Sequence, residues 1–415
     1  MITFKNIFFM GSSTAVRLVS GLLSFALMAR LLGPVPFGIV MFWLSVATLV
    51  TLVCNYGFTS YVLREIGAYP DTAHTVMSEV LSAKILIGAI VLILSVVALP
   101  FLDKGNLAIY LLLLLAQLAD STSDFLNVGY RATNRYDIET RIATAASVLQ
   151  LGLVAGIVWS YPTATIAAFA YFVSRSCVLV MTWISMRQYF AALKPASVNM
   201  AWHRIRAAVS YAADFGLQSL FGQIDSIVLN CSIGPSAVGL YQAGMRLFLG
   251  GSQVATVLGN VFIPTASRAY ITGDKFYDVL IKLQVTFIGV GIIGAIFFCA
   301  LPQQITFLLY GHKYQLLSTY LPLFGILFLV RFFASGWGIT LTISGNQGIR
   351  SKIIFVHWLV LLAAALYLVP EYGVAGWLYS LIFGNLLLSI AYLFAVLING
   401  LPNLFGYVFT KRQSI

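Results

Sequence analysis

The chain has 415 residues, of which 60% are hydrophobic and only 9% are charged, and its mean hydropathy is +0.93. Soluble domains carry about 25% charged residues, so this composition excludes a soluble globular protein and indicates an integral membrane protein. The formal charge of +11 comes from 24 Lys and Arg against 13 Asp and Glu. In a membrane protein such an excess is typical of cytoplasmic loops rather than of nucleic-acid binding.

Apolar segments of about twenty residues, the length that crosses a bilayer as a helix, recur along the whole chain. They predict an all-α protein with twelve transmembrane helices and short connections, of which 302–317 is the longest on the outer side. The predicted helices cover residues 9–31, 37–62, 80–101, 106–129, 142–160, 163–186, 208–232, 236–262, 279–301, 318–342, 353–370 and 373–398.

The basic residues predict the orientation of these helices. If both termini are cytoplasmic, most Lys and Arg residues lie on the inner side, and the outer connections hold only Lys104 and Lys313, with Arg30 at a helix edge. Because Lys and Arg are enriched in cytoplasmic loops, this is the favoured orientation. Lys84 and Lys282 lie near inner helix ends, so we expect their ammonium groups to extend to the interface.

A short motif appears twice and suggests an internal repeat. GPVPFG begins at residue 33 and GPSAVG begins at residue 234, 201 positions later (234 − 33). The same shift aligns the first two helices with the seventh and eighth, which predicts two six-helix halves in the same orientation, a parallel repeat. The predicted domains are an N-terminal bundle at 1–190, a basic cytoplasmic linker at 191–207, a C-terminal bundle at 208–400 and a basic cytoplasmic tail at 401–415.

Polar side chains form one-faced stripes on three of the repeated helices: Ser13, Arg17, Ser20 and Ser24 on the first, Tyr211, Asp214, Gln218 and Asp225 on the seventh, and Gln242, Arg246 and Gln253 on the eighth. A charge in the middle of a membrane is costly, so it needs a partner or a hydrated cavity. One hypothesis is a hydrated central cleft between the halves, in which Arg17 and Arg246 contact an anion. The alternative is that the charges form internal pairs, such as Asp214 or Asp225 with Arg246. The candidate substrate-binding residues are Arg17, Arg246, Ser13, Ser24, Gln218, Gln242 and Gln253.

A second group of intramembrane charges lies mainly in the N-terminal half. Asp120 and Asp124 share a face of one helix, and Arg175 lies two helices later. We favour a structural carboxylate–arginine pair, with a proton or sodium site as the alternative. Lone His357 is interpreted as a packing residue. Candidates for cation coupling or ion pairing are Asp120, Asp124, Asp214, Asp225, Arg175 and Arg331.

Motifs for enzymatic chemistry are not found. The sequence contains no G-x-x-x-x-G-K-[ST] phosphate loop, which excludes ATP hydrolysis by that route. It also contains no H-E-x-x-H motif and no C-x-x-C spacing. We therefore expect neither catalysis nor a metal or other cofactor.

Three stretches carry a family resemblance: ARLLGPVPFGIVMFW, NYGFTSYVLREIG and IGPSAVGLYQAGMRLF. They resemble the polysaccharide-exporter branch of the MATE-like (multidrug/oligosaccharidyl-lipid/polysaccharide) superfamily, and more closely the bacterial O-antigen flippases. The resemblance implies a V-shaped pair of six-helix bundles in the bacterial inner membrane. By alternating access, these bundles would move an undecaprenyl-pyrophosphate-linked oligosaccharide from the cytoplasmic to the periplasmic leaflet.

The resemblance also implies a cationic cavity, at which Arg17 and Arg246 are the matching positions by location. Asp214 and Asp225 depart from a uniformly basic cavity. The implied partners are the lipid-linked glycan, membrane lipids, and the polysaccharide polymerase and chain-length machinery, with no nucleic acid.

Three other functions compete with this one. A cation-coupled drug antiporter of the same fold would use Asp120 or Asp124 as its coupling carboxylate. A peptidoglycan-precursor flippase is a close sibling, although members of that group typically have two further helices. A membrane glycan polymerase or ligase is disfavoured, because such enzymes usually need a large outer loop.

Overall fold

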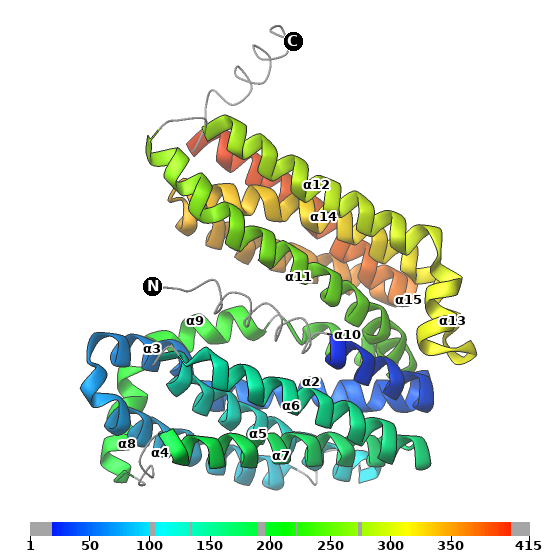
Figure 1. Cartoon of the computed structure of the whole chain (residues 1–415). Coiled ribbons are helices and arrows are strands. Elements are labelled where there is room, and N and C mark those ends of the chain that lie inside the picture. Colours follow the sequence, from blue (N-terminus) through cyan, green and yellow to red (C-terminus); the bar gives the residue numbers. More distant parts are fainter. Residues whose placement is uncertain are drawn as a thin grey trace, which may run out of the picture. The chain divides into compact units, whose positions relative to one another are not determined.

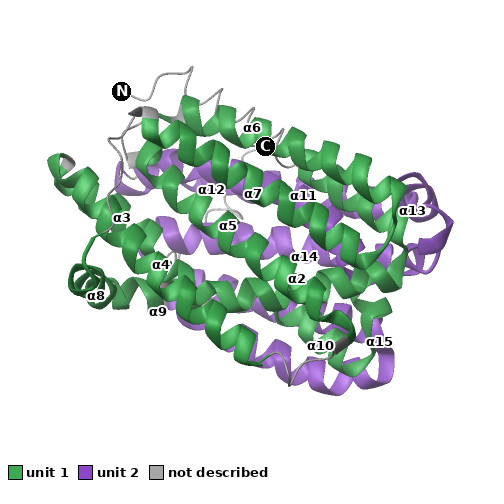
Figure 2. Cartoon of the chain, turned by 90° about the horizontal axis from the view of Figure 1, so that it is seen from below, with its two compact units in different colours: residues 1–239 green, residues 240–415 purple. Residues whose placement is uncertain are grey.

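The computed structural model describes residues 19–98, 104–132, 135–189, 196–220, 222–272 and 276–399 (Figure 1). Every regular element in these ranges is a helix, which confirms the predicted all-α class. The chain divides into two compact units, residues 1–239 and 240–415 (Figure 2). The boundaries predicted from the sequence at 190 and 208 stay a prediction, and the tail 401–415 lies outside the described residues.

Unit 1 is a bundle in which α5 packs against α2 and α7, and α7 also packs against α6. Buried apolar side chains from α3, α4, α5 and α8 form a core at one end of this bundle. Its elements are Val19–Leu32, α2 (Pro34–Asn55), α3 (Phe58–Ala68), η1 (Pro70–Thr72), α4 (Ala73–Ala98), η3 (Lys104–Asn106), α5 (Leu107–Ala132), α6 (Tyr136–Leu153), the π-helical η4 (Val154–Val158), α7 (Ala164–Tyr189), α8 (Val198–Ala207), α9 (Val209–Leu220) and α10 (Ile224–Ser232).

The second predicted span, 37–62, is two helices rather than one. Tyr56 and Gly57 both have left-handed backbone conformations, with φ of 46° and 65°, and they separate α2 from α3. A Cβ atom at Gly57 would overlap the backbone of Tyr211 in α9, so this break is also where α9 passes closest. Glycine is required here both for the positive φ and for the close approach.

The repeated glycine–proline motif starts α2 and α11 (Pro235–Thr272) in the same way. Gly33 and Gly234 have positive φ angles, and the proline that follows each is the first residue of a helix. A positive φ favours glycine, and proline is tolerated at the first helical position because the N–H it lacks would have no helical partner there. Each motif therefore separates two helices by a very short connection. The connection is Gly33 before α2, and it is residues 233–234 before α11.

Within unit 1 the two motifs also pack against each other. A Cβ atom at Gly38 would overlap the carbonyl oxygen of Pro235, and a Cβ atom at Gly239 would overlap the carbonyl oxygen of Pro34. The first turns of α2 and α11 therefore cross at backbone contact. Gly38 and Gly239 are themselves 201 positions apart, so the crossing pairs equivalent residues of the internal repeat.

Unit 2 comprises the rest of α11, α12 (Phe276–Ala300), α13 (Pro302–Tyr310), η5 (His312–Tyr314), α14 (Leu317–Ile343) and α15 (Gln347–Asn399). The central helix is α14, which packs against both α12 and α15 (Figure 1). Gly244 and Gly251 of α11 lie against the rings of Phe324 and Phe328 in α14. These aromatic rings fill the space that the glycines leave, and they stack further with neighbouring phenylalanines.

Nine helices in the described part of the chain are long and apolar enough to cross a membrane, which identifies a multi-pass membrane protein. The last of them, α15, contains two predicted spans, because Gly373 has non-helical angles (φ 60°, ψ −131°) at the junction predicted near residue 371. The predicted outer connection 302–317 contains α13 and η5, which hydropathy did not predict.

Candidate functional site

The predicted stripe on the first helix falls largely outside the described residues, which do not include Ser13 or Arg17. Ser24 is described; it is buried and donates a 2.7 Å hydrogen bond to the carbonyl oxygen of Ser20 in its own helix. The side chains of Asp214 and Gln218 are likewise outside the described part of the chain.

The predicted stripe on α11 is present as one helical face. Gln242, Arg246 and Gln253 lie within roughly 40° of one another at 100° per residue. Gly244 and Gly251, which contact α14, lie roughly 180° away from that stripe. The polar stripe is therefore on the side of α11 that faces away from α14.

Arg246 itself lies close to α13. It interacts electrostatically with the Tyr310 hydroxyl, which donates a 2.8 Å hydrogen bond to the carbonyl oxygen of Ala243. Gln242 is buried, and Arg246 and Gln253 are half-buried. The face thus combines one guanidinium with two carboxamides, which are groups that can bind phosphate oxygens and sugar hydroxyls.

Asp225 lies in the first turn of α10 and is buried. Its Oδ1 atom accepts a 2.6 Å hydrogen bond from the backbone N–H of Ser226. A carboxylate is stabilised at a helix N-terminus by the unpaired N–H groups and by the helix dipole. Asp225 is therefore placed where the first turn of α10 stabilises its charge, two residues after the N-cap residue Gln223.

Asp120 and Arg175 are brought together between α5 and α7. Arg175 Nη1 lies 3.0 Å from Asp120 Oδ1, and Arg175 Nη2 donates a 3.1 Å hydrogen bond to Gln150 Oε1. The guanidinium also lies 4.9 Å from the ring centroid of Tyr171. A charge held by an ion pair, a carboxamide and an aromatic ring is stabilised inside the bundle, whereas removal of either charged partner would leave the other uncompensated.

Asp124 is directed elsewhere, to Arg131 on the next turns of α5. The two side chains are 2.9 Å apart, and Arg131 also bonds to Glu139 of α6 at 2.8 Å. Asp124 and Arg131 are partly exposed. The two candidate coupling carboxylates therefore have separate arginine partners, and Arg175 binds only Asp120 of the two.

The interface position predicted for Lys84 is wrong. The Lys84 side chain is only 4% exposed, and its ammonium donates to the Cys54 carbonyl (3.2 Å), to Asn55 Oδ1 (3.0 Å) and to Ser121 Oγ (2.6 Å). Three acceptors match the three N–H donors of an ammonium group. The C-terminal carbonyls of α2 attract the charge inward, because helix C-termini stabilise cations.

Two further candidates lie in unit 2. Arg331 of α14 donates a 3.1 Å hydrogen bond to Asn385 Oδ1 of α15, which connects the two helices. His357 is buried, and its Nδ1 atom lies 3.0 Å from the carbonyl oxygen of Gly384. This contact gives the imidazole a partner in α15, as expected for a packing residue, although His357 also lines a pocket between the two segments of α15.

The predicted linker contains α8, which is tied to the bundle by Arg204. Its Nε donates to Glu79 Oε2 (2.6 Å), and its Nη1 donates to Tyr61 Oη (2.7 Å). Burial lowers the pKa of Arg204, but the hydrogen bonds to Tyr61 and Glu79 outweigh it and hold this pKa above its usual range. Hydropathy gave no signal for this network, because α8 is too short and too polar to be a span.

Comparison with known proteins identifies the fold and the family of this chain. Over 339 residues the chain is 23% identical to the inner membrane protein YghQ of Escherichia coli (strain K12), covering 75% of this chain and 93% of that protein. It superposes on the lipid II flippase MurJ in an inward closed conformation with a TM-score of 0.75 and 14% identity, covering 97% of this chain and 93% of that chain.

A multidrug resistance MATE family transporter in an inward-facing conformation superposes with a TM-score of 0.66 and 14% identity, covering 92% of this chain and 93% of that chain. These structural similarities confirm the predicted MATE-like fold. The model of one protein family, described as polysaccharide biosynthesis protein, matches residues 3–270, which is more than half of the chain. The chain therefore belongs to this family of polysaccharide biosynthesis proteins, with the fold of the MATE-like transporters.

Proposed function

We propose that this protein is a flippase for an undecaprenyl-pyrophosphate-linked oligosaccharide, such as an O-antigen repeat unit. It moves this lipid from the cytoplasmic to the periplasmic leaflet of the bacterial inner membrane by alternating access. The observation that carries the proposal is the match of the polysaccharide biosynthesis family over residues 3–270. The fold shared with MurJ adds support, because MurJ is named as a flippase of a lipid, lipid II.

The physical chemistry of α11 suits such a substrate. A pyrophosphate cannot cross about 30 Å of hydrocarbon without a polar path, and arginine offers planar, bidentate donors for phosphate oxygens. Arg246 and the carboxamides of Gln242 and Gln253 supply a guanidinium and sugar-binding groups on one face. Arg17, Ser13, Ser24 and Gln218 remain proposed members of the same site, with both termini in the cytoplasm.

The second candidate is a cation-coupled drug antiporter, which the likeness to a multidrug transporter supports. Such a protein needs an intramembrane carboxylate that can take up a proton or sodium ion. Asp120 and Asp124 instead bond to Arg175 and Arg131. An adjacent arginine favours the charged form of a carboxylate and so opposes proton uptake, although Arg131 is shared by Asp124 and Glu139. The flippase is therefore the better-supported function.

Deletion of the gene tests the proposal. We expect surface glycan to be lost and lipid-linked oligosaccharide to accumulate facing the cytoplasm. Drug efflux that follows an ion gradient, together with unchanged surface glycan in the deletion strain, would replace the flippase with the antiporter.

Complementation of that strain tests the binding face. Arg246→Ala removes charged hydrogen bonds worth about 1.5–3 kcal/mol, so export is expected to fall roughly tenfold to a hundredfold at near-normal protein level. Lys282→Ala, at an exposed position of α12, serves as the control and should export normally. Full export by Arg246→Ala would remove this residue from the substrate site.

A further inference from the structure

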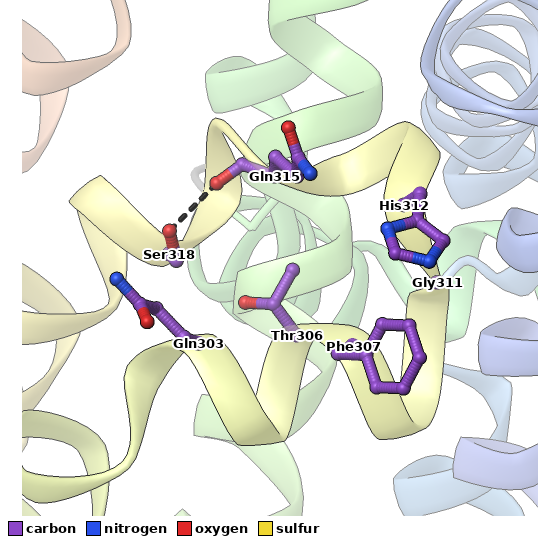
Figure 3. Close-up of a pocket in the computed structure, with 7 residues that line it drawn as sticks. All are labelled: Gln303, Thr306, Phe307, Gly311, His312, Gln315 and Ser318. Carbon is purple, nitrogen blue, oxygen red and sulfur yellow. Dashed lines mark hydrogen bonds between the residues drawn. The ribbon is translucent and has the colours of Figure 1, made fainter.

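A pocket of about 420 Å³ lies at the end of unit 2, where α13, η5 and the start of α14 meet (Figure 3). Figure 3 shows its lining residues on two facing segments, one formed by α13 and the other by η5 and the residues after it. This volume is in the range of small-ligand sites. The lining residues are Gln303, Thr306, Phe307, Gly311, His312, Gln315 and Ser318.

The framework beneath the pocket is rigid. Tyr310 and Tyr314 are fully buried, their ring centroids lie 5.3 Å apart, and the Tyr310 hydroxyl is bonded to α11 through Ala243. Gly311, with φ of 74°, ends α13, and its N–H donates to the carbonyl oxygens of Thr306 and Phe307 at 3.1 Å. Backbone and core contacts therefore hold the two segments that carry the lining side chains.

Most of the side chains that line the pocket are polar, and none of the seven described lining residues is an acidic residue, a lysine or an arginine. Two carboxamides, two hydroxyls and one imidazole line the pocket together with a phenyl ring. An anionic phosphate would call for arginine or lysine, and a cationic drug would call for a carboxylate. The lining instead suits a neutral ligand that is rich in hydroxyl groups.

The donor and acceptor pattern is that of a sugar site. Ser318 Oγ donates to the carbonyl oxygen of Gln315 (2.7 Å), so its oxygen can accept a hydrogen bond from a ligand. Thr306 Oγ1 donates to the carbonyl oxygen of Pro302 (2.8 Å), and Thr306 is buried in the wall of the pocket. The carboxamides of Gln303 and Gln315 each offer donors and an acceptor, as sugar hydroxyls require.

The phenyl ring of Phe307 provides an apolar surface next to these groups. It is 53% exposed, and His312 packs against it in an edge orientation, with centroids 4.7 Å apart. Aromatic rings offer a large apolar contact, which the C–H face of a pyranose can cover. Phe307 lies on the same segment as Gln303, and Gln315 and Ser318 lie on the facing one (Figure 3), so a sugar between the two segments would meet the ring and polar groups together.

We propose that this pocket binds neutral sugar residues of the exported glycan on the periplasmic side of the membrane. The inference rests on the proposed function, and it adds a second contact for the glycan, away from the pyrophosphate-binding face of α11. The pocket would retain the sugar portion after it has crossed, while the lipid tail stays in the bilayer.

The test uses the full chain in lipid nanodiscs and three variants. The double variant Gln303→Leu/Gln315→Leu removes both carboxamides, and Phe307→Leu removes the ring. Gln304→Leu is the matched control, because Gln304 is exposed on the same helix but does not line the pocket. The probe is the free oligosaccharide released by mild acid from the lipid-linked glycan of the host, and binding is followed by saturation-transfer NMR.

We expect saturation transfer to sugar protons with the wild-type chain and with Gln304→Leu. The double variant should bind at least roughly tenfold more weakly, since each of the two lost hydrogen bonds contributes about 1 kcal/mol. Phe307→Leu should also bind more weakly, because it loses the large flat contact of the aromatic ring. Equal binding by all four proteins, or no binding by the wild-type chain, would overturn the inference.

Export in cells separates this inference from the proposed function. If the deletion strain lacks surface glycan and the double variant exports more slowly than Gln304→Leu at equal protein level, both stand. If the deletion strain lacks glycan but the double variant exports at the wild-type rate, the pocket inference fails and the flippase stands. Normal glycan in the deletion strain would reject the flippase itself.

Discussion

Buried charges in unit 1 are held by several helices at once, and Lys84 is the clearest example. Its ammonium bonds to two residues at the end of α2 and to Ser121 of α5. Ser121 in turn donates to Asn55 Oδ1, so the two neutral side chains are also bonded to each other. The lysine therefore connects three helices through neutral acceptors, which makes its contribution structural as well as electrostatic.

Lys84→Met is expected to destabilise the protein by about 1–3 kcal/mol, because methionine fills a similar volume but leaves the buried Cys54 carbonyl without its donor. Thermal unfolding of the purified full chain in detergent measures the change. Lys282→Met is the control: Lys282 is exposed on α12, so its replacement should leave the midpoint unchanged. Equal midpoints for the two variants would contradict the assigned bonding of Lys84.

At this scale the sequence predicted that intramembrane charges form pairs, but it did not predict which residues each charge contacts. The spacing of Asp120, Asp124 and Arg175 indicated an ion pair within the N-terminal half, and the structure shows that Arg175 selects Asp120. The position of Lys84 near a helix end suggested the interface, because the break at Tyr56 and Gly57 that supplies its acceptors is not visible in hydropathy. Contacts between helices depend on such local geometry.

At the scale of elements, the crossing of α2 and α11 depends on two glycines. Gly38 and Gly239 each face the carbonyl oxygen of the proline that begins the other helix. Backbone contact of this kind is possible only where both positions lack a Cβ atom, and small residues are the usual means of close helix approach in membranes. The repeated motif therefore specifies both helix starts and the contact between them.

Gly38→Ala and Gly239→Ala should each destabilise the protein by about 1–3 kcal/mol or more, because a methyl group there meets backbone rather than a side chain that can move. The two effects should be similar, since the two positions are equivalent in the repeat. Gly289→Ala is the control: nothing lies within 4 Å of a Cβ atom at Gly289 in α12, so alanine should be neutral or stabilise by up to about 1 kcal/mol. If Gly38→Ala and Gly239→Ala unfold at the same midpoint as Gly289→Ala, the close crossing of α2 and α11 is refuted.

Sequence analysis predicted the long helices and missed the short ones. The ends of α5, α7 and α14 lie close to the predicted spans, because about twenty consecutive apolar residues are a strong signal. α13 and η5 lie in what hydropathy predicted as a connection, since neither is long enough to cross a bilayer. The polar pocket at 303–318 was missed for the same reason, although its Gln, Thr and Ser residues were visible in the sequence.

At the scale of the whole molecule, composition and fold agree on a multi-pass membrane protein. A fold shared with MurJ at 14% identity shows that few specific side chains are needed to specify it. What persists at that distance is the pattern of apolar spans, because the bilayer requires every spanning segment to satisfy its own backbone hydrogen bonds. Under the proposed function, specificity for one glycan would reside in a few polar positions, such as those on α11 and around the pocket.

The orientation of the chain is the prediction that connects these sites to transport. Cytoplasmic termini place α8 inside the cell and η5 in the periplasm, so the exposed side chains of Arg206 and Lys313 lie on opposite sides of the membrane. In a chain whose four native cysteines are replaced by serine, Lys313→Cys should react with a membrane-impermeant maleimide in intact cells. Arg206→Cys should react only after the inner membrane is opened.

The reverse pattern would place the pocket of α13 and η5 in the cytoplasm, where it would meet the glycan before transport rather than after it. It would also put most of the basic residues outside the cell. Such an orientation would contradict the rule that Lys and Arg are enriched in cytoplasmic loops. The labelling pattern thus decides whether the pocket accepts the sugar at the start of the transport cycle or retains it at the end.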